Sequence, residues 1–360
     1  MHFVYSFGFG GMEVGVAKLS NAIDPALVHV SICSGRPSDT LKHRLRPEVR
    51  FFELDRRPGN DPRLVWRLYR LLRRERPHVL HTHGWATLCE GLLAARLAGV
   101  PLVVHGEHGT LDTGRANVMV QRWGWARVDQ MLSVSSRLAE RMERLIGFPS
   151  ERIKVIRNGV DVRRFTPHHR TEGRRSLGLP PDRIVLGTAG RLVPVKDQAT
   201  LLRAWGILED RGHDFTGIIA GKGILLDELT ALATSLRLRD VRFLGNRPDV
   251  EHVLAAMDVF LLTSESEGLS NTIQEAMATG LPVVATRVGG ADELVVENET
   301  GALVPPGNPQ AIADALEALI ADSSTRQRWG RAGRKRAEDV FSLDLMVDDY
   351  VELYRTLARA

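Results

Sequence analysis

The sequence predicts an α/β protein with two doubly wound parallel-sheet domains in tandem. Short apolar runs alternate with longer amphipathic stretches, which is typical of a parallel sheet covered by helices on both faces. The pattern restarts once, after Arg157-Asn158-Gly159-Val160-Asp161, where turn formers and charged residues gather up to about residue 181. We therefore expect one domain over residues 1–158 and a second over residues 159–340.

The elements of the first domain follow from apolar runs and from apolar positions three and four residues apart. The chain is expected to open with a strand over residues 1–5. Further buried strands are predicted at residues 28–33, 50–53, 78–81, 102–104 and 131–134. Helices are predicted over residues 12–23, 62–75, 86–97 and 136–146. Because strands and helices alternate, the strands are expected to lie parallel.

The second domain repeats this alternation. Its strands are predicted at residues 183–189, 217–220, 241–244, 259–262 and 282–285. Its helices are predicted over residues 198–209, 225–235, 250–256 and 271–279, and two more follow at 325–339 and 343–357. Ligands of such sheets bind beyond the carboxyl ends of the strands. A cleft between two facing sheets is therefore the expected site.

The composition, with 43% hydrophobic and 26% charged residues, is that of a soluble globular protein. No apolar run approaches the roughly 18 residues that span a membrane, and no basic segment precedes the apolar N-terminus as in a signal peptide. Cys33 and Cys89 lie far apart without CxxC spacing, so neither a disulfide scaffold nor a structural zinc site is predicted, and a cytoplasmic location is expected. No basic motif with interleaved aromatic residues is present, so nucleic acid is not expected as a partner.

A glycine-rich turn, Gly8-Phe9-Gly10-Gly11-Met12-Glu13, follows the first strand and opens a helix. The backbone N–H groups of such a turn can approach an anion at the helix N-terminus. A dinucleotide fingerprint of the form G-x-G-x-x-G would need glycine at position 13, where the Glu13 carboxylate would repel a pyrophosphate. A tight structural turn is the alternative interpretation.

Arg191 and Lys196 lie five residues apart in the turn Gly190-Arg191-Leu192-Val193-Pro194-Val195-Lys196-Asp197, after the first strand of the second domain. A planar guanidinium and an ammonium point charge around a proline-stiffened turn suit a diphosphate. Two solvated surface cations are the alternative interpretation.

Glu267 and Glu275 lie eight residues apart, the first in a loop after the strand at 259–262 and the second in the helix that follows. Backbone N–H groups at the start of this helix are expected to seat a phosphate. They belong to Leu269, Ser270, Asn271 and Thr272. The two carboxylates can accept hydrogen bonds from sugar and ribose hydroxyls, or they can simply cap the helix. Their combination with Arg191 and Lys196 favours a binding site.

The pattern formed by these residues resembles that of the retaining glycosyltransferases of family 4, which have the GT-B fold. The resemblance covers almost the whole chain, and its most specific part is Glu267…Glu275 with Ala276-Met277-Ala278-Thr279-Gly280-Leu281-Pro282-Val283-Val284-Ala285 after it. Other matching points are Gly10-Gly11-Met12-Glu13, His108, Asn158-Gly159-Val160-Asp161 and residues 301–306. A closer likeness is to the sugar transferases of exosortase and exopolysaccharide systems. It depends on Gly106-Glu107-His108-Gly109, Val195-Lys196-Asp197-Gln198 and Ser270-Asn271-Thr272-Ile273.

The resemblance implies two Rossmann-like domains, of which the first binds a glycan or lipid-linked acceptor and the second a nucleotide-sugar donor. The last helix, residues 341–360, is expected to pack back on the first domain. Where many relatives have an acidic residue and a proline, this chain has Gly221-Lys222-Gly223-Ile224. That departure leaves the choice between a UDP-linked and a GDP-linked donor open.

The resemblance also assigns roles to single residues. Arg191 and Lys196 would neutralise the departing diphosphate, next to Gly190 in the donor site. Glu275 would hold the ribose hydroxyls and Glu267 would lie against the donor sugar. The remaining assignments are His108, which would contact the sugar near the reacting carbon, and Gly10 and Gly11, whose backbone would face the phosphates or the acceptor.

The expected reaction needs neither a metal nor another cofactor. Fixed cations and helix N–H groups can stabilise a departing diphosphate, and the sequence contains no Asp-x-Asp motif. The transition state should resemble an oxocarbenium ion. Family membership implies that the anomeric configuration of the sugar is retained. Attack by the acceptor on the same face as the leaving phosphate, which helps to take the acceptor proton, would explain this outcome. A covalent glycosyl–enzyme intermediate is the alternative. His81, His83 and His105 could instead form a metal site, although no cysteine or carboxylate pair joins them at ligand spacing.

Charge is divided unevenly between the halves of the chain. Residues 1–160 carry 24 basic and 15 acidic side chains, a balance of +9, while residues 161–360 carry 24 and 29, a balance of −5. Arginines at 67, 70, 73, 74, 76, 137, 141 and 144 could attract an anionic acceptor or the inner membrane surface. Residues 64–69 could then touch lipid, unless they belong to an ordinary helix packed on the sheet.

Two other classes of function remain open at this point. One is an NAD-dependent oxidoreductase or epimerase. Two features count against it: Glu13 in the glycine-rich turn, and the lack of an obvious ribose-binding acidic residue after the second strand. The other is a non-catalytic protein that binds a nucleotide or a sugar. The presence of Arg191, Lys196, Glu267 and Glu275 in one sequence counts against a protein that has lost its catalytic activity.

Overall fold

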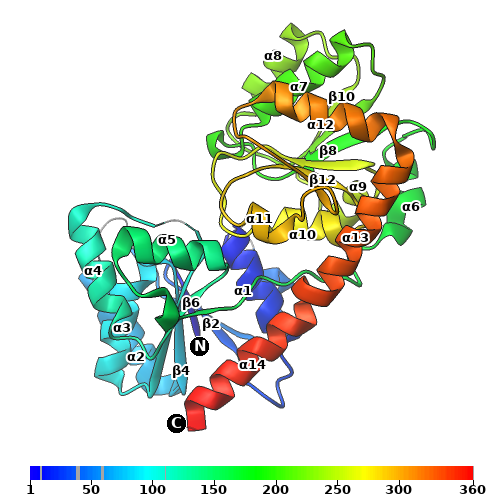
Figure 1. Ribbon diagram of the computed structural model, residues 1–360. Coiled ribbons are helices and arrows are strands. Elements are labelled where there is room, and N and C mark those ends of the chain that lie inside the picture. The colour runs from blue at the N-terminus through cyan, green and yellow to red at the C-terminus, as the bar shows by residue number, and fades with distance from the viewer. Residues whose placement is uncertain (9, 38–40, 58–60, 110, 360) are drawn as a thin grey trace. The chain divides into compact units, whose positions relative to one another are not determined.

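The computed structural model describes residues 1–8, 10–37, 41–57, 61–109 and 111–359 (Figure 1). The chain forms two compact units. Unit 1 comprises Met1–Gly159 and Leu343–Ala360, and unit 2 comprises Val160–Ser342. The predicted boundary at 158/159 thus lies one residue from the observed one, and the last helix belongs to unit 1.

The sheet of unit 1 has, within the described ranges, seven parallel strands in the order β3-β2-β1-β4-β5-β6-β7. Their bounds are β1 His2–Val4, β2 Ser31–Ser34, β3 Arg50–Glu53, β4 Val79–His83, β5 Leu102–Glu107, β6 Gln130–Ser133 and β7 Ile153–Val155. The order reverses between β1 and β4, which makes their carboxyl ends the switch point where ligands of such sheets bind.

Helices cover both faces of this sheet (Figure 1). They are α1 Gly11–Ala22, α2 Pro62–Glu75, α3 Trp85–Ala98, α4 Arg115–Trp125, α5 Ser136–Ile146 and α14 Leu343–Arg359, with short 3₁₀ turns η1 Lys42–Arg44 and η2 Ser150–Arg152. On one face α14 packs with α1 and the sheet; its buried side chains are Met346, Tyr350, Val351, Leu353 and Tyr354. The other face is covered by α2 and α3, which lie side by side.

Unit 2 has the same topology. Six parallel strands can be traced in its described residues, in the order β10-β9-β8-β11-β12-β13. Their bounds are β8 Val185–Ala189, β9 Thr216–Ala220, β10 Val241–Gly245, β11 Val259–Leu262, β12 Val283–Thr286 and β13 Gly301–Val304. The switch point lies between β8 and β11, the strands that precede the Lys196 turn and the Glu267 loop.

The helices of unit 2 complete a second three-layer domain. They are α6 Arg170–Ser176, α7 Gln198–Asp210, α8 Leu226–Ser235, α9 Val250–Ala255, α10 Asn271–Ala278, α11 Ala291–Leu294, α12 Pro309–Ala321 and α13 Ser323–Phe341, with η3 Pro167–His169 and η4 Pro194–Lys196. One face of the sheet is covered by α7 and α12, whose core contains the fully buried Trp205. The opposite face carries α9 and α10, and α13 packs on α10.

The predicted fold class, α/β with two doubly wound parallel sheets, is confirmed. Most predicted elements lie within two or three residues of observed ones, but six strands and α-helices were missed: β7, β13, α4, α6, α11 and α12. β7 is a three-residue edge strand with one buried position, and α4 exposes several apolar side chains, so neither has the expected pattern. No helix in the described parts of the chain is long and apolar enough to cross a membrane.

Candidate active site

Hydrogen bonds hold the turn after β8 so that Lys196 has a defined position. Asp197 adopts a left-handed φ of 43° and caps α7, since its carboxylate accepts from the N–H of Thr200 at 3.2 Å. The hydroxyl of Thr263, at the end of β11, lies 3.1 Å from the carbonyl oxygen of Lys196 and 2.8 Å from that of Asp197. The turn is thereby fixed against the loop that carries Glu267.

Lys196 and Glu267 form an ion pair at the carboxyl ends of β8 and β11. Nζ of Lys196 lies 2.5 Å from Oε1 of Glu267, and the hydroxyl of Ser264 donates to the same oxygen at 2.6 Å. The two side chains are only 18% and 12% exposed. An ammonium group has three donors, so the pair leaves Lys196 with capacity to bind an anion while its position is set by Glu267. Both residues were predicted to belong to the site, but the ion pair between them was not predicted.

Arg191 differs from Lys196 in its surroundings. Its side chain is exposed and forms no ion pair with any residue that the structure describes. Its carbonyl oxygen accepts from the side-chain amide of Gln198 at 2.9 Å. The guanidinium is therefore available to a ligand, as the diphosphate hypothesis requires.

The Gly221-Lys222-Gly223 loop after β9 packs directly on the Arg191 turn. The N–H of Leu192 donates to the Lys222 carbonyl at 3.0 Å. A Cβ on Gly221 would lie 1.8 Å from the Gly190 oxygen, and one on Gly223 would lie 2.0 Å from the Leu192 oxygen. Both positions require glycine because backbone meets backbone there. The two glycines of this loop therefore allow its backbone to pack closely on the Arg191 turn.

A second glycine turn supports the Glu267 loop from the other side. Gly289 has φ +56°, and a Cβ there would lie 2.1 Å from the Glu267 carbonyl oxygen. The N–H of Gly290 donates to the Gly268 carbonyl at 2.8 Å. The Gly289-Gly290 turn therefore packs directly on the backbone of Glu267 and Gly268.

The helix that follows, α10, begins where the sequence analysis expected it. Ser270 is its N-cap, and its hydroxyl accepts from the N–H of Ile273 at 3.5 Å and lies 3.1 Å from the Thr272 hydroxyl. The first N–H groups of a helix have no partner within the helix, so this end can attract a phosphate. Glu275 lies one turn further and is 9% exposed. Six of the predicted residues around α10, from Glu267 to Glu275, therefore lie on one loop–helix segment next to Lys196.

The predicted residues of unit 1 form a separate group. Gly10 is the N-cap of α1, and a Cβ there would lie 2.1 Å from Oε2 of Glu13. The Glu13 carboxylate thus folds over the start of α1, where a dinucleotide fingerprint would hold a pyrophosphate. Gly11 begins the helix itself. Phe9, between the glycines of the turn, lies outside the described residues.

His108 follows β5, and its Nε2 lies 3.0 Å from Nδ1 of His83. Its own Nδ1 is buried and has no hydrogen-bond partner among the described residues. Burial and the charge of nearby His105 lower the pKa of His108 to about 4, so its ring is neutral at pH 7. A neutral ring with one unpartnered nitrogen can accept from or donate to a sugar hydroxyl.

The three histidines considered as a metal site do not converge. His105 faces the opposite side of the sheet from His81 and His83: its Nδ1 lies 2.7 Å from the Thr82 hydroxyl and its Nε2 lies 3.1 Å from the Glu107 carboxylate. A different trio does gather, in which His2 replaces His105, with ligand atoms within 4.8 Å of one another. Two of its nitrogens, on His2 and His83, are hydrogen-bonded at 2.9 Å. Nitrogens that share a tetrahedral zinc stand about 3.3 Å apart, so the observed spacing is that of a hydrogen bond.

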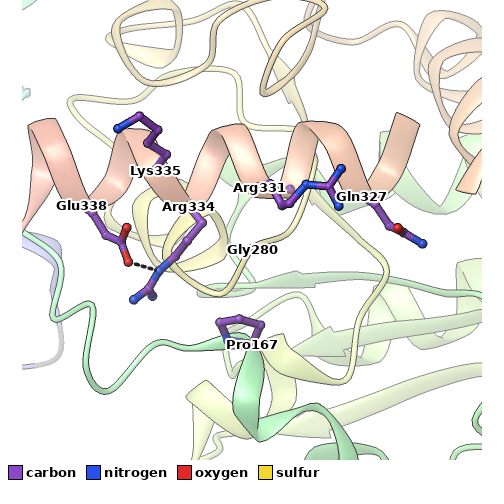
Figure 2. Close-up of a pocket in the computed structure, with 8 residues that line it drawn as sticks. Pro167, Gly280, Gln327, Arg331, Arg334, Lys335 and Glu338 are labelled. Atoms are coloured by element: carbon purple, nitrogen blue, oxygen red, sulfur yellow. Dashed lines mark hydrogen bonds and ion pairs between the residues drawn. The ribbon is translucent and has the colours of Figure 1, made fainter. Parts of the chain in front are cut away.

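A cavity of about 340 Å³ in unit 2 contains none of the predicted site residues (Figure 2). Pro167, Gly280 and one side of α13 line it. Arg334, in its wall, donates to the Phe165 carbonyl at 2.6 Å, to the Ala278 carbonyl and to Glu338 at 2.6 Å. These contacts tie α13 to neighbouring loops, which is a structural role.

Comparison with known proteins identifies the family. Residues 9–164 match the sequence model described as Glycosyltransferase Family 4, and residues 169–336 match that of Glycosyl transferases group 1. The chain belongs to the family 4 glycosyltransferases, as the resemblance predicted. This membership decides against the oxidoreductase and epimerase interpretation.

Curated relatives cover most of the chain. A D-inositol 3-phosphate glycosyltransferase of Pseudarthrobacter chlorophenolicus is 30% identical over 92% of this chain and 86% of its own. A UDP-Gal:alpha-D-GlcNAc-diphosphoundecaprenol alpha-1,3-galactosyltransferase of Escherichia coli is 30% identical over 82% of this chain and 79% of its own. Among solved structures, Anabaena HepE in complex with UDP matches with a TM-score of 0.86 at 24% identity, covering 99% of both chains. That likeness supports the fold.

Proposed function

We propose that this glycosyltransferase moves a sugar from a UDP- or GDP-linked donor to a glycan or lipid-linked acceptor, with retention of configuration and without a metal. We assign the reaction to exopolysaccharide or cell-envelope glycan synthesis. The observation that carries the proposal is the Lys196–Glu267 pair, held between the switch-point strands of unit 2 and next to the start of α10. Two similar proteins support the proposal: the Escherichia coli enzyme is named for a UDP-galactose donor, and Anabaena HepE has been solved with UDP and glucose.

Each part of the donor has a matching group in unit 2. The diphosphate lies between Lys196, Arg191 and the N–H groups at the start of α10. The ribose hydroxyls donate to Glu275, and a sugar hydroxyl donates to Glu267. Within unit 1, the unpartnered Nδ1 of His108 can bind a sugar hydroxyl.

The proposed reaction step occurs on one face of the sugar. The bond between the anomeric carbon and the diphosphate oxygen breaks as the acceptor oxygen bonds to that carbon. The acceptor proton passes to the departing phosphate oxygen. Lys196, Arg191 and the helix dipole stabilise the negative charge that develops on the departing diphosphate. Fixed charges of this kind usually make the largest single contribution to lowering the activation barrier.

Nucleotide binding in EDTA tests this proposal. UDP or GDP, at about a hundred times its dissociation constant and with excess EDTA, stabilises the protein by about 2.7 kcal/mol. The expected rise in melting temperature is several degrees, and ADP and NAD give none. Lys196→Ala weakens nucleotide binding by roughly 10- to 150-fold, because a charged hydrogen bond of about 1.5–3 kcal/mol is lost.

Lys335→Ala is the matched control, since Lys335 is an exposed lysine on α13 of the same unit. It should bind nucleotide like the wild type. A shift with NAD alone, full nucleotide affinity in Lys196→Ala, or a shift that EDTA abolishes would each contradict the proposal.

A second proposal concerns an anionic membrane as the partner of unit 1. The α2 segment suspected of touching lipid is largely buried: Leu64 and Leu68 are fully covered, and only Trp66 is strongly exposed. Other exposed apolar side chains lie on α3 and α4, two helices that contact each other. The side chains are Leu93, Leu97, Met119, Val120 and Trp123, with exposed arginines at 96, 115, 122 and 127 between them. Apolar side chains mixed with arginines suit the headgroup region of an anionic bilayer.

Vesicle pelleting at low salt tests the membrane proposal. The wild type is expected to pellet with phosphatidylglycerol-containing vesicles and not with neutral ones. Met119→Ser combined with Trp123→Ser should lower the bound fraction at least about tenfold, since each side chain contributes about 1.5–3 kcal/mol when buried. Trp66→Ser on α2 is the matched control and should leave binding unchanged. Failure of the wild type to pellet would refute the proposal.

A further inference from the structure

Four histidines gather in unit 1 from three separate segments. His2 belongs to β1, His81 and His83 to β4, and His108 follows β5. Parallel pairing places His2 opposite His81, and His81 and His83 point to the same face because side chains two residues apart on a strand do so. The three strand histidines are at most 3% exposed. The family comparison assigns no role to His2 or His83.

The rings of three of these histidines form a continuous hydrogen-bonded row. Nε2 of His108 lies 3.0 Å from Nδ1 of His83, and Nε2 of His83 lies 2.9 Å from Nδ1 of His2. His81 is stacked on His83 at a centroid distance of 4.1 Å, but its own bond runs from Nδ1 to the Tyr354 hydroxyl at 2.8 Å. His81 is therefore a neighbour of the row and not a member.

Each ring in the row carries a single proton. Desolvation lowers the pKa of His2 and His83 well below the ordinary value, as it does for His108. A neutral imidazole has one N–H donor and one acceptor nitrogen. If Nε2 of His108 donates to Nδ1 of His83, then the proton of His83 is on Nε2 and is donated to Nδ1 of His2. If Nδ1 of His2 donates to Nε2 of His83 instead, then the proton of His83 is on Nδ1 and is donated to Nε2 of His108. The protonated nitrogen of His108 is thus coupled to the state of the other two rings.

We propose that His83 and His2 are positioning residues that fix the ring orientation and the protonated nitrogen of His108, so that its unpartnered Nδ1 is presented to a sugar hydroxyl in one defined state. The relevance of this positioning to catalysis rests on the proposed function. Nδ1 of His108 is buried without a partner among the described residues, so a sugar hydroxyl that reached it would supply a hydrogen bond that the protein itself does not make. The row supplies the orientation that such a contact needs, because misplacement by about 1 Å can cost a hundredfold in rate.

Gly106 makes room for this arrangement. A Cβ at Gly106 would lie 3.1 Å from Nε2 of His81, 3.4 Å from Nε2 of His108 and 3.8 Å from Nδ1 of His83. The first distance is tighter than an ordinary contact and the second is at the lower limit of one, so a methyl group would press on the His81 ring and leave no spare room beside His108. The absence of a side chain at Gly106 therefore leaves the space that these rings occupy.

Three variants separate positioning from general packing. His83→Leu removes both hydrogen bonds of the row. His83→Asn keeps a polar atom near the position of Nδ1 and can restore the bond to His108. His81→Asn is the matched control, because it alters an equally buried histidine of the same strand and keeps a partner for Tyr354.

Transfer kinetics give the first measurement. We expect His83→Leu to lower kcat about tenfold to a hundredfold with KM for the donor nearly unchanged. His83→Asn should recover part of that loss, and His81→Asn should resemble the wild type. Equal losses in His83→Leu and His81→Asn would overturn the proposal, because the effect would then be one of packing.

A spectroscopic measurement on the free protein is independent of activity. Nitrogen-15 correlation spectra of histidine-labelled protein distinguish the protonated nitrogen of each ring, and His108→Ala assigns the His108 signals. The wild type should show His108 in a single neutral tautomer, and His83→Leu should show a mixture. If the wild type transfers no sugar but the spectra change in this way, the proposed function fails and the positioning stands. An unchanged His108 spectrum in His83→Leu overturns the positioning itself.

Discussion

Glu267→Gln is expected to lower sugar transfer at least about a thousandfold while the protein folds normally. A thousandfold corresponds to about 4 kcal/mol of transition-state stabilisation. The neutral amide keeps the shape of the side chain but cannot pair with the Lys196 ammonium or balance the positive charge that develops on the sugar. Transfer rates and melting temperatures of the purified variant are the measurements.

Nucleotide affinity separates this loss from a binding defect. In Glu267→Gln the ammonium of Lys196 is released from its ion pair, so affinity for UDP or GDP should stay within a few fold of the wild type or increase. Glu265→Gln is the matched control, since Glu265 is exposed in the same loop, and it should be fully active. If Glu267→Gln kept a tenth or more of the wild-type rate, the role given to this carboxylate would be wrong.

Leu353→Ala is expected to destabilise unit 1 by about 2–5 kcal/mol, because it removes buried methyl groups and leaves a cavity. Leu353 is 3% exposed and packs in the cluster that joins α14 to α1, β5 and β6. For a unit of this size the loss should lower the melting temperature by roughly 5 to 15 °C. Calorimetry can resolve whether unit 2 melts separately, and its transition should not move.

Leu345→Ala is the control for this variant. Leu345 lies on the same helix but is 42% exposed, so the same substitution should cost well under 1 kcal/mol. Equal losses in the two variants would mean that α14 does not contribute to the core of unit 1 as the structure indicates.

The sequence was sufficient to predict the sheets because their central strands are continuous apolar runs. β11, Val259–Leu262, is buried at every position and was predicted with its observed bounds. β7 was missed because an edge strand with one buried residue has no such run. α4 was missed because Met119 and Trp123 are exposed, which removes the apolar periodicity that a helix packed on a sheet usually has.

The site could be predicted as a set of residues but not as a set of contacts. Motif resemblance identified Lys196 and Glu267 separately, and nothing in a separation of 71 residues indicates that their side chains meet. The histidine row was missed for a related reason. The spacing of His81 and His83 places both on one face of a strand, but only the register of β1 against β4 brings His2 beside them.

The chain order of the two units has a consequence for how the protein folds during synthesis. Unit 2 is one continuous segment, whereas unit 1 needs α14, which the ribosome makes after all of unit 2. Until then the faces of α1, β5 and β6 that receive Tyr350, Val351 and Leu353 are uncovered. The second unit can therefore mature first, and the nascent first unit is the stage at which chaperones or aggregation would act.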